Sequence, residues 1–199
     1  MRPLFKLKEF AMLDSKTAIT TSARRAISIG VFGGVIGSLA MAMYAMIISN
    51  SVKHTGFFTP LYHIASSFIS GKAMMASMTG AMHGNNFYFD FGPAVVGALV
   101  HMMTGAIAGA IFVLLISKTQ VSRAITIVAG TMFGLLVLVV NGFIGLPIVS
   151  HIFGGGKPIS DMAKIVGWGH FTVEHLIFGM MLGIIVAFTL RPSSKSTHS

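Results

Sequence analysis

Four long apolar stretches, none with a lysine or arginine away from its ends, constrain what this chain can fold into. They cover about residues 26–49, 93–117, 124–149 and 165–190. A helix needs about 20 consecutive apolar residues to cross a hydrocarbon core of about 30 Å. Since lipid offers the backbone no hydrogen bonds, only helices and closed barrels span it. The sequence therefore predicts an all-α, polytopic membrane protein with four transmembrane helices.

The composition agrees with lipid as the solvent. Of the 199 residues, 54% are hydrophobic and 10% are charged, whereas an ordinary soluble domain carries about 25% charged residues. This balance excludes a disordered chain, a nucleic-acid module and most water-soluble enzymes. Cysteine is absent, which excludes disulfides, iron–sulfur clusters and covalently attached c-type haem. We expect one transmembrane domain, residues 1–199, that is not an enzyme on its own.

The basic residues predict the orientation in the membrane. If the N-terminus is inside, ten of them are cytoplasmic: Arg2, Lys6, Lys8, Lys16, Arg24, Arg25, Lys118, Arg123, Arg191 and Lys195. The outer side then holds four: Lys53, Lys72, Lys157 and Lys164. This positive-inside bias predicts a multi-pass protein of the cell (plasma or inner) membrane, with cytoplasmic tails 1–23 and 191–199. The net charge of +9 is thus an orientation signal, and no nucleic-acid partner is expected.

Two features complicate the count of four spans. The segment 60–82 has helical length but contains several serines and Lys72, so we expect one helix in the first outer loop, lying in the interface or re-entering it. The pair Arg24-Arg25 before the first span also resembles the start of a signal peptide. That span continues well past the only candidate cleavage site, at Ala42, which favours an uncleaved helix.

A few ionisable residues lie within the predicted spans. Glu174 is the one carboxylate there, and His101, His170 and His175 accompany it. Such residues are costly in lipid, and they usually face the bundle interior with a partner or a task. Glu174 and His170, four residues apart on one helical face, are therefore candidates for metal ligands or proton-relay groups. The alternative is a structural glutamate near the interface, either protonated or paired with a histidine.

The second and fourth spans share the pattern H-x-x-x-G-x-x-x-G. The matching residues are His101, Gly105 and Gly109 in one and His175, Gly179 and Gly183 in the other. The first and third spans carry matching glycine pairs, Gly30 with Gly34 and Gly130 with Gly134. Small residues spaced by four let membrane helices approach closely. The repeat predicts two helical hairpins of the same orientation, related by an axis along the membrane normal.

The repeat also places two histidines at similar depth. At 1.5 Å per residue, His101 lies about 12 Å below Pro93 and His175 about 15 Å below Ile165. Facing each other, they could ligate a b-type haem or a copper, iron or zinc ion. We therefore expect His101 and His175 as cofactor ligands, with His170 and Glu174 completing a metal site. The alternative is that both histidines are hydrogen-bonded to carbonyls or to Glu174 in a tight bundle.

Two further patterns concern transport and copper. Met74, Met78 and Met82 form a stripe at helical spacing, and thioethers with imidazoles suit copper, although methionine is also common packing material. Asn141 and Pro147, with two glycines between them, loosen the end of the third span. Broken helices of this kind can mark a transport site.

The layout resembles the YagU-like inner-membrane proteins, a family of four-span proteins without an established chemistry. The resemblance rests on His101 within the second span, Pro147 near the end of the third, and Gly169-His170 at the start of the fourth. It implies an integral membrane protein of unknown activity.

Together these patterns suggest a small membrane protein that binds a transition metal or b-type haem in a histidine-rich site in the outer half of the bundle. It could serve as an accessory subunit of a membrane redox complex. The alternatives are a proton- or cation-coupled transporter or channel subunit, and a purely structural or assembly subunit. Expected partners are the lipid bilayer and other membrane subunits, or a second copy bound through the glycine stripes.

Overall fold

The computed structural model describes residues 3–119 and 121–190, with side chains from residue 23 onward, and this part of the chain is helical without any β-strand. Four helices are long and apolar enough to cross a membrane: Ala23–Ser51, Phe91–Ile116, Arg123–Phe153 and Trp168–Thr189. These correspond to α1 (Pro3–Ser51), α4 (Phe91–Ile116), the run of α5 (Arg123–Val140), η1 (Asn141–Gly145) and α6 (Leu146–Phe153), and α9 (Trp168–Thr189). The all-α, four-span prediction is confirmed, whereas the predicted tail 191–199 lies outside the described residues.

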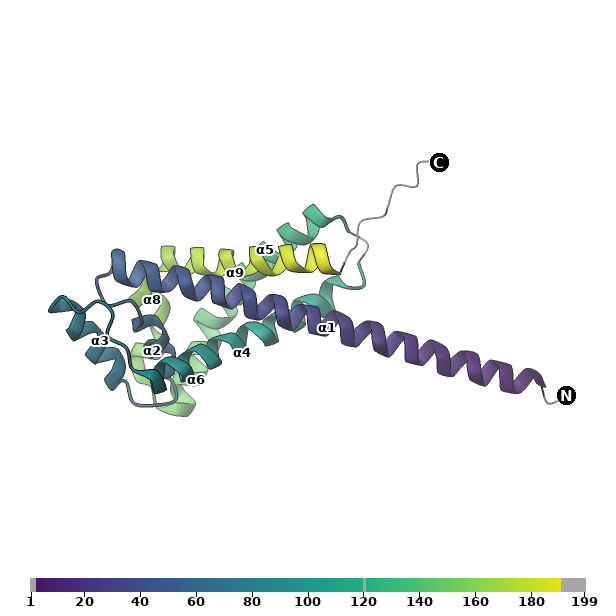
Figure 1. Ribbon diagram of the computed structural model, residues 1–199, viewed down its shortest axis with the longest axis horizontal. Helices are drawn as coiled ribbons and strands as arrows, with labels where there is room; N and C mark the ends of the chain where they lie inside the picture. Colours follow the sequence, from purple (N-terminus) through teal and green to yellow (C-terminus); the bar gives the residue numbers. More distant parts are fainter. Residues whose placement is uncertain (1–2, 120, 191–199) are drawn as a thin grey trace.

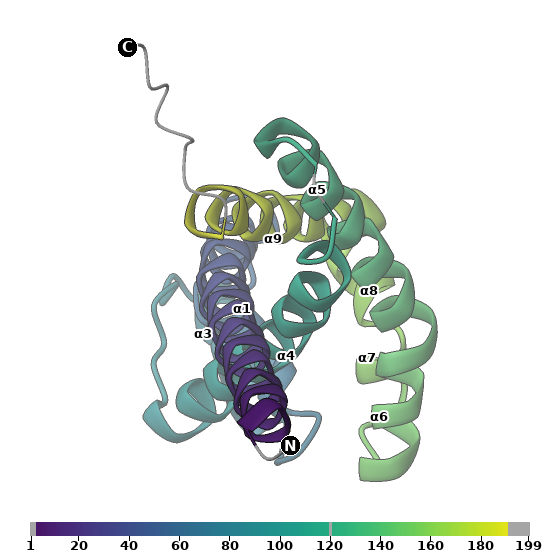
Figure 2. The same cartoon turned by 90° about the vertical axis from the view of Figure 1, so that its right-hand side faces the viewer.

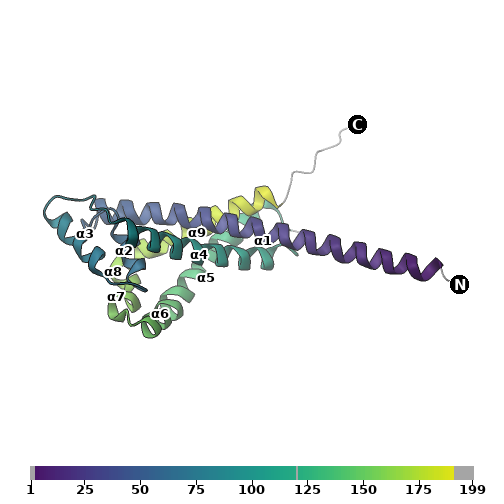
Figure 3. The same ribbon diagram turned by 60° about the horizontal axis from the view of Figure 1, so that its bottom comes forward.

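Four short helices gather at one end of the bundle (Figures 1 and 3). They are α2 (Thr59–Ala65), α3 (Lys72–Met82), α7 (Gly156–Ser160) and α8 (Met162–Val166). We call this the loop end, which the charge bias predicts to be the outer side. Helix α1 extends from the opposite end toward the N-terminus, so most of the predicted tail 1–23 is helical and continuous with the first span.

The segment 60–82, predicted as one interfacial helix, forms two helices instead. Helix α2 ends at Ala65 and α3 begins at Lys72. In the break, the Ser66 hydroxyl donates back to the carbonyl of His63 at 2.7 Å, and serine hydroxyls that bond locally compete with the helical ladder. Because of the break, α2 packs against α4 at the loop end, where Tyr62 and His63 are buried.

The first hairpin, α1 with α4, is held by glycines. A Cβ atom added to Gly34 would overlap the carbonyl oxygen of Gly105, and one added to Gly109 would overlap that of Gly30. The two backbones are therefore in direct contact, as small residues at four-residue spacing allow. The glycine stripes predicted in the first and second spans therefore face each other across the α1–α4 interface.

The second hairpin, α5 with α9, uses the corresponding glycines. A Cβ on Gly130 would lie 2.6 Å from the Cα of Gly183, and one on Gly179 would overlap the carbonyl oxygen of Gly130. A Cβ on Gly134 would overlap the carbonyl oxygen of His175. The glycine stripes that we expected to serve a partner chain thus pack within the chain itself, and association with other subunits stays a prediction.

The two hairpins join on one side only. Helix α1 packs along α9, where Gly33 and Gly37 lie against Leu182 and the carbonyl of Phe178. Helices α4 and α5 have few contacts, although Phe112 and Phe133 touch at 5.3 Å between ring centroids. The run from α5 to α6 diverges from α4 toward the loop end (Figure 2). A twofold axis relating the hairpins would make the α4–α5 contact as extensive as the α1–α9 contact, and it is not. The glycine pairing within each hairpin therefore repeats, whereas the packing between the hairpins is asymmetric.

The third span contains a π-helical turn, η1, in the segment that the sequence marked as loosened. Pro147 follows it and has no N–H to donate to the carbonyl of Phe143, and its ring crowds that carbonyl. A widened turn relieves this crowding. Phe143 then stacks on Trp168 of α9, at 5.2 Å between ring centroids and an interplanar angle of 18°.

The glycine contacts can be tested by adding one methyl group. Gly134→Ala should destabilise the protein by about 1–3 kcal/mol, because the backbone of α9 must move away. Thermal unfolding in detergent, followed by loss of the monodisperse peak in size-exclusion chromatography, measures the change. Gly169→Ala, in α9 and with nothing within 4 Å of its added Cβ, is the control and should leave the midpoint unchanged or slightly higher. Equal midpoints for the two variants would contradict the tight α5–α9 contact.

Candidate functional site

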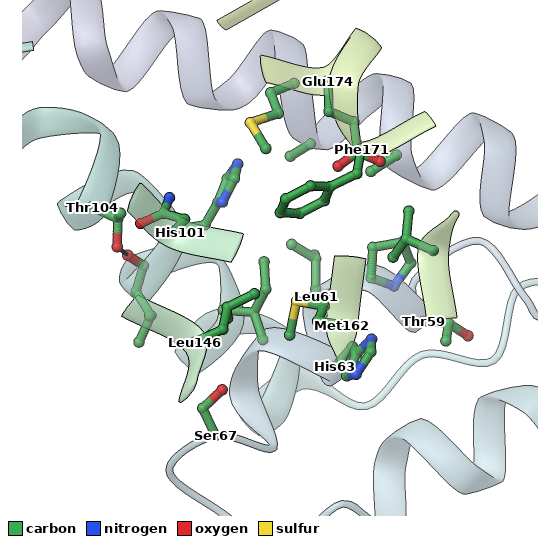
Figure 4. Close-up of a pocket in the computed structure, with 18 of the residues that line it drawn as sticks. Thr59, Leu61, His63, Ser67, His101, Thr104, Leu146, Met162, Phe171 and Glu174 are labelled. Carbon is green, nitrogen blue, oxygen red and sulfur yellow. Dashed lines mark hydrogen bonds between the residues drawn. The ribbon is translucent and has the colours of Figure 1, made fainter. Parts of the chain in front are cut away.

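A cavity of about 580 Å³ lies in the loop-end half of the bundle. It occupies the space left where α4 and the α5–α6 run diverge, and α1 and α9 also line it. At the loop end, α2, α3, α7 and α8 contribute residues. Its lining is mostly apolar, and examples are Met41, Ile48, Leu61, Leu146 and Phe178. Figure 4 shows His101 and Glu174 projecting toward the same space beside Phe171. The arrangement is a mainly apolar pocket with a few polar side chains.

His101 holds one ring nitrogen against the neighbouring helix. Its Nε2 donates to the backbone carbonyl of Ser38 in α1 at 3.0 Å. A carbonyl only accepts, so in the neutral ring Nε2 carries the hydrogen and Nδ1 keeps a lone pair. Nδ1 has no hydrogen-bond partner among the described residues.

His175 is oriented by its own helix. Its Nδ1 donates to the carbonyl of Phe171 at 2.8 Å, and the two rings touch at 4.4 Å between centroids. The side chain is 1% exposed, and Nε2 is left with a lone pair and no partner in the described part of the chain. Both carbonyl bonds match the hydrogen-bonded alternative that the sequence left open, and both leave one nitrogen free on the cavity side.

Glu174 is the unusual group of the cavity. It is 5% exposed, lines the cavity, and forms no hydrogen bond or ion pair with any described residue. Across those same residues, the one fully enclosed side-chain polar atom without a partner is Oδ1 of Asn50. The unpartnered atoms of Glu174, His101 and His175 are therefore reachable from the cavity. A buried carboxyl without a partner costs several kcal/mol in an apolar medium, which makes Glu174 the candidate polar group for a ligand of this cavity.

The cavity brings together three of the four predicted site residues and leaves out the fourth. His101, Glu174 and His175 line it, whereas His170 packs toward α1, where the Tyr44 hydroxyl lies 3.2 Å from its Nδ1. Over the described residues, no three histidine, aspartate or glutamate side chains are close enough to hold one metal ion. The three groups share a cavity without meeting at a point.

The glycines that suggested a haem pocket are used elsewhere. Gly105 and Gly109 pack against α1, and Gly179 and Gly183 pack against α5, so none of them offers a flat surface to a ring in the cavity. The methionine stripe is divided: Met74 and Met78 line the cavity, as Met41 does, whereas Met82 is exposed.

Sequence reasoning missed two features of the site. Ser38, whose carbonyl orients His101, continues the four-residue spacing of Gly30 and Gly34, so the stripe itself could have indicated it. Thr104 is exposed on α4 and also lines the cavity. No sequence pattern signals that this position borders a cavity.

His63 joins two of the short helices at the loop end of the cavity. It is 7% exposed, and its Nε2 donates to the carbonyl of Pro158, just inside α7, at 2.8 Å. Burial lowers the pKa of His63 below its usual value of 6.5, and the hydrogen bond to Pro158 raises it by a smaller amount. The sequence placed His63 only in an outer loop.

No family model, no curated protein and no solved structure matches this chain. The resemblance to the YagU-like proteins therefore stays a prediction from the sequence.

The link between α2 and α7 predicts how stability depends on pH. A lowered pKa means that the folded protein binds fewer protons at His63 than the unfolded chain, so stability falls as the pH drops below about 6.5. His63→Gln keeps an N–H donor but cannot take up a proton. When the pH is lowered from about 7.5 to about 5.5, the melting temperature of this variant should fall by less than that of the unsubstituted protein.

The matched control for this prediction is His83→Gln, because His83 is exposed in the loop after α3. Its loss on acidification should equal that of the unsubstituted protein. If His63→Gln shows the same acid sensitivity as both of them, His63 does not contribute to it.

Proposed function

We propose that this multi-pass membrane protein binds a small molecule with an apolar body and a polar head in its loop-end cavity. The observation that carries the proposal is Glu174, a buried carboxyl without a protein partner, opening on an apolar cavity of about 580 Å³. Ligand pockets typically measure about 300–1,000 Å³ and combine apolar walls with a few convergent polar groups. His101, His175 and Asn141 are among the other polar residues that line it.

The surroundings of the cavity suggest that the ligand enters from lipid. Thr104 of the membrane-spanning helix α4 both lines the cavity and is exposed. Lys53, exposed at the loop end, lies at another edge. With the orientation predicted from the basic residues, the site lies in the outer half of the cell membrane. Apolar molecules concentrate in the bilayer, so an opening within a span would give them direct access.

A photoreactive alcohol tests the proposal. The protein in lipid nanodiscs is illuminated with a diazirine derivative of octanol, and labelled residues are located by peptide mass spectrometry. We expect labelling of cavity residues such as Met41 and Met74, competed by excess octanol. Ala42→Phe, which fills the cavity from α1, should reduce it about tenfold, as for a loss of about 1.4 kcal/mol of binding.

The control for cavity filling is Met43→Phe, since Met43 is the next residue of α1 and is exposed. It adds an aromatic ring to the lipid-facing surface and should leave the labelling of Met41 and Met74 unchanged. Labelling confined to lipid-facing residues, or equal labelling in both variants, would refute a ligand site in the cavity.

A second candidate is the metal or haem protein expected from the sequence. The observation in its favour is that His101 and His175 each fix one ring nitrogen on a carbonyl and leave the other free toward the same cavity. Metal-ligating histidines are oriented by hydrogen bonds of this kind. A copper, iron or zinc ion, or a b-type haem, would then be held by these two histidines with Glu174 nearby, and the protein could act as an accessory subunit of a redox complex.

This candidate predicts stoichiometric copper, iron or zinc, or a Soret band, in gently purified protein. Single substitutions His101→Ala and His175→Ala should each abolish it, because one imidazole alone binds weakly. Elemental analysis and absorption spectroscopy provide the measurement, with His151→Ala, an exposed histidine of α6, as the control. Colourless, metal-free protein would refute this candidate and leave the first one standing.

Proton- or cation-coupled transport is the less favoured proposal. It would need a path through the other half of the bundle. There, Phe112, Val113, Leu182 and Val186 form a core with exposed fractions of 3% or less. That core separates the cavity from the far side of the membrane.

A further inference from the structure

The hydrogen-bonding character of the cavity indicates what kind of head group it accepts. His101 donates its ring hydrogen to the backbone carbonyl of Ser38. His175 donates its ring hydrogen to the backbone carbonyl of Phe171. In both neutral rings the free nitrogen is therefore an acceptor. The histidines present two lone pairs, and no donor, to a ligand.

Glu174 adds oxygen acceptors without a counter-charge. An ionised carboxyl only accepts hydrogen bonds, and a buried charge is usually paired. The described cation that lines the same cavity is Lys53, which is exposed at its edge and forms no ion pair with Glu174. The positive charge that would pair with Glu174 is thus missing from this part of the protein.

The apolar walls are also compatible with a cation. Phe171 and Phe178 line the cavity, and both are buried. Aromatic faces attract cations, more strongly where water is excluded. Met41, Met74 and Met78 add polarizable thioethers along the same cavity, and unbranched methionine side chains adapt to varied apolar shapes.

We propose that the ligand of the cavity is a lipophilic amine, whose ammonium pairs with Glu174 in a cavity where the free nitrogens of His101 and His175 are acceptors. This inference rests on the proposed function and adds the chemical class of the ligand. An ammonium carries a positive charge and has three donors and no acceptor, which complements the carboxylate of Glu174. A ligand with a carboxylate head would be repelled by the charge of Glu174.

Three competitors with the same eight-carbon chain separate the head group from the tail. Octylamine, octanol and octanoate are compared, at equal membrane-partitioned concentrations and neutral pH, for their ability to suppress labelling by the photoreactive octanol in nanodiscs. Hydrogen bonds to a charged group are stronger than those between neutral groups. We therefore expect octylamine to compete at least about tenfold better than octanol, and octanoate to compete least.

Glu174→Gln tests the residue assigned to the ammonium. The amide keeps the size of the side chain and removes its charge, so octylamine should lose its advantage while octanol competes as before. Asp161→Asn is the control, because Asp161 is an exposed acid at the loop end and does not line the cavity. It should keep the preference for the amine.

The outcomes distinguish the two proposals. If the photoreactive octanol does not label the cavity, the proposed function itself fails. If it labels the cavity but the three competitors act equally, or octanoate acts best, only the amine class is wrong. The comparison of head groups uses the unsubstituted protein, so it decides the question even if Glu174→Gln does not fold.

Discussion

Direct backbone contact between glycine-bearing helices is the interaction on which this structure depends. Lipid is as apolar as the side chains it surrounds, so helices gain little from burying apolar surface against each other, and close packing must hold them. Gly34 against Gly105, and Gly130 against Gly179 and Gly183, bring carbonyls of one helix next to the Cα atoms of the other. These contacts hold α1 against α4 and α5 against α9, and the remaining helices pack around these two pairs.

The way the pairs meet creates the site. Gly33 and Gly37 give α1 a second face for α9, while α4 and α5 have few contacts. Pro147 and the π-helical turn before it carry the third span further from α4 toward the loop end. The cavity occupies the resulting space, and α2, α7 and α8 border it at the loop end. His101 and His175 reach it because each heads the glycine stripe that docks its helix, which fixes the depth of both rings at one end of the contact.

Some of this could be predicted from the residues alone, and the failures have physical causes. The four spans follow from the length of the apolar runs, and the close contacts follow from glycines at four-residue spacing. Residues four apart share a helical face, which grouped His170 with Glu174. One face of α9 is wide enough to border both α1 and the cavity. His170 contacts Tyr44 of α1, whereas Glu174 lines the cavity. The break between α2 and α3, residues 66–71, was not predicted. It depends on the burial of α2 as well as on local hydrogen bonds of serine, and the sequence pattern does not show that burial.

The sequence by itself determined that the chain crosses a membrane four times, which helix faces can touch, and which few ionisable groups lie in the spans, because apolar length and residue spacing are local properties. The tertiary structure decided that the second face of α1 takes α9, that α4 and α5 stand apart, and that three of the four candidate residues share one cavity. Those outcomes depend on how two hairpins with several possible faces pack together. That choice rests on contacts between residues far apart in the chain, such as Gly37 with Phe178, which no local pattern contains.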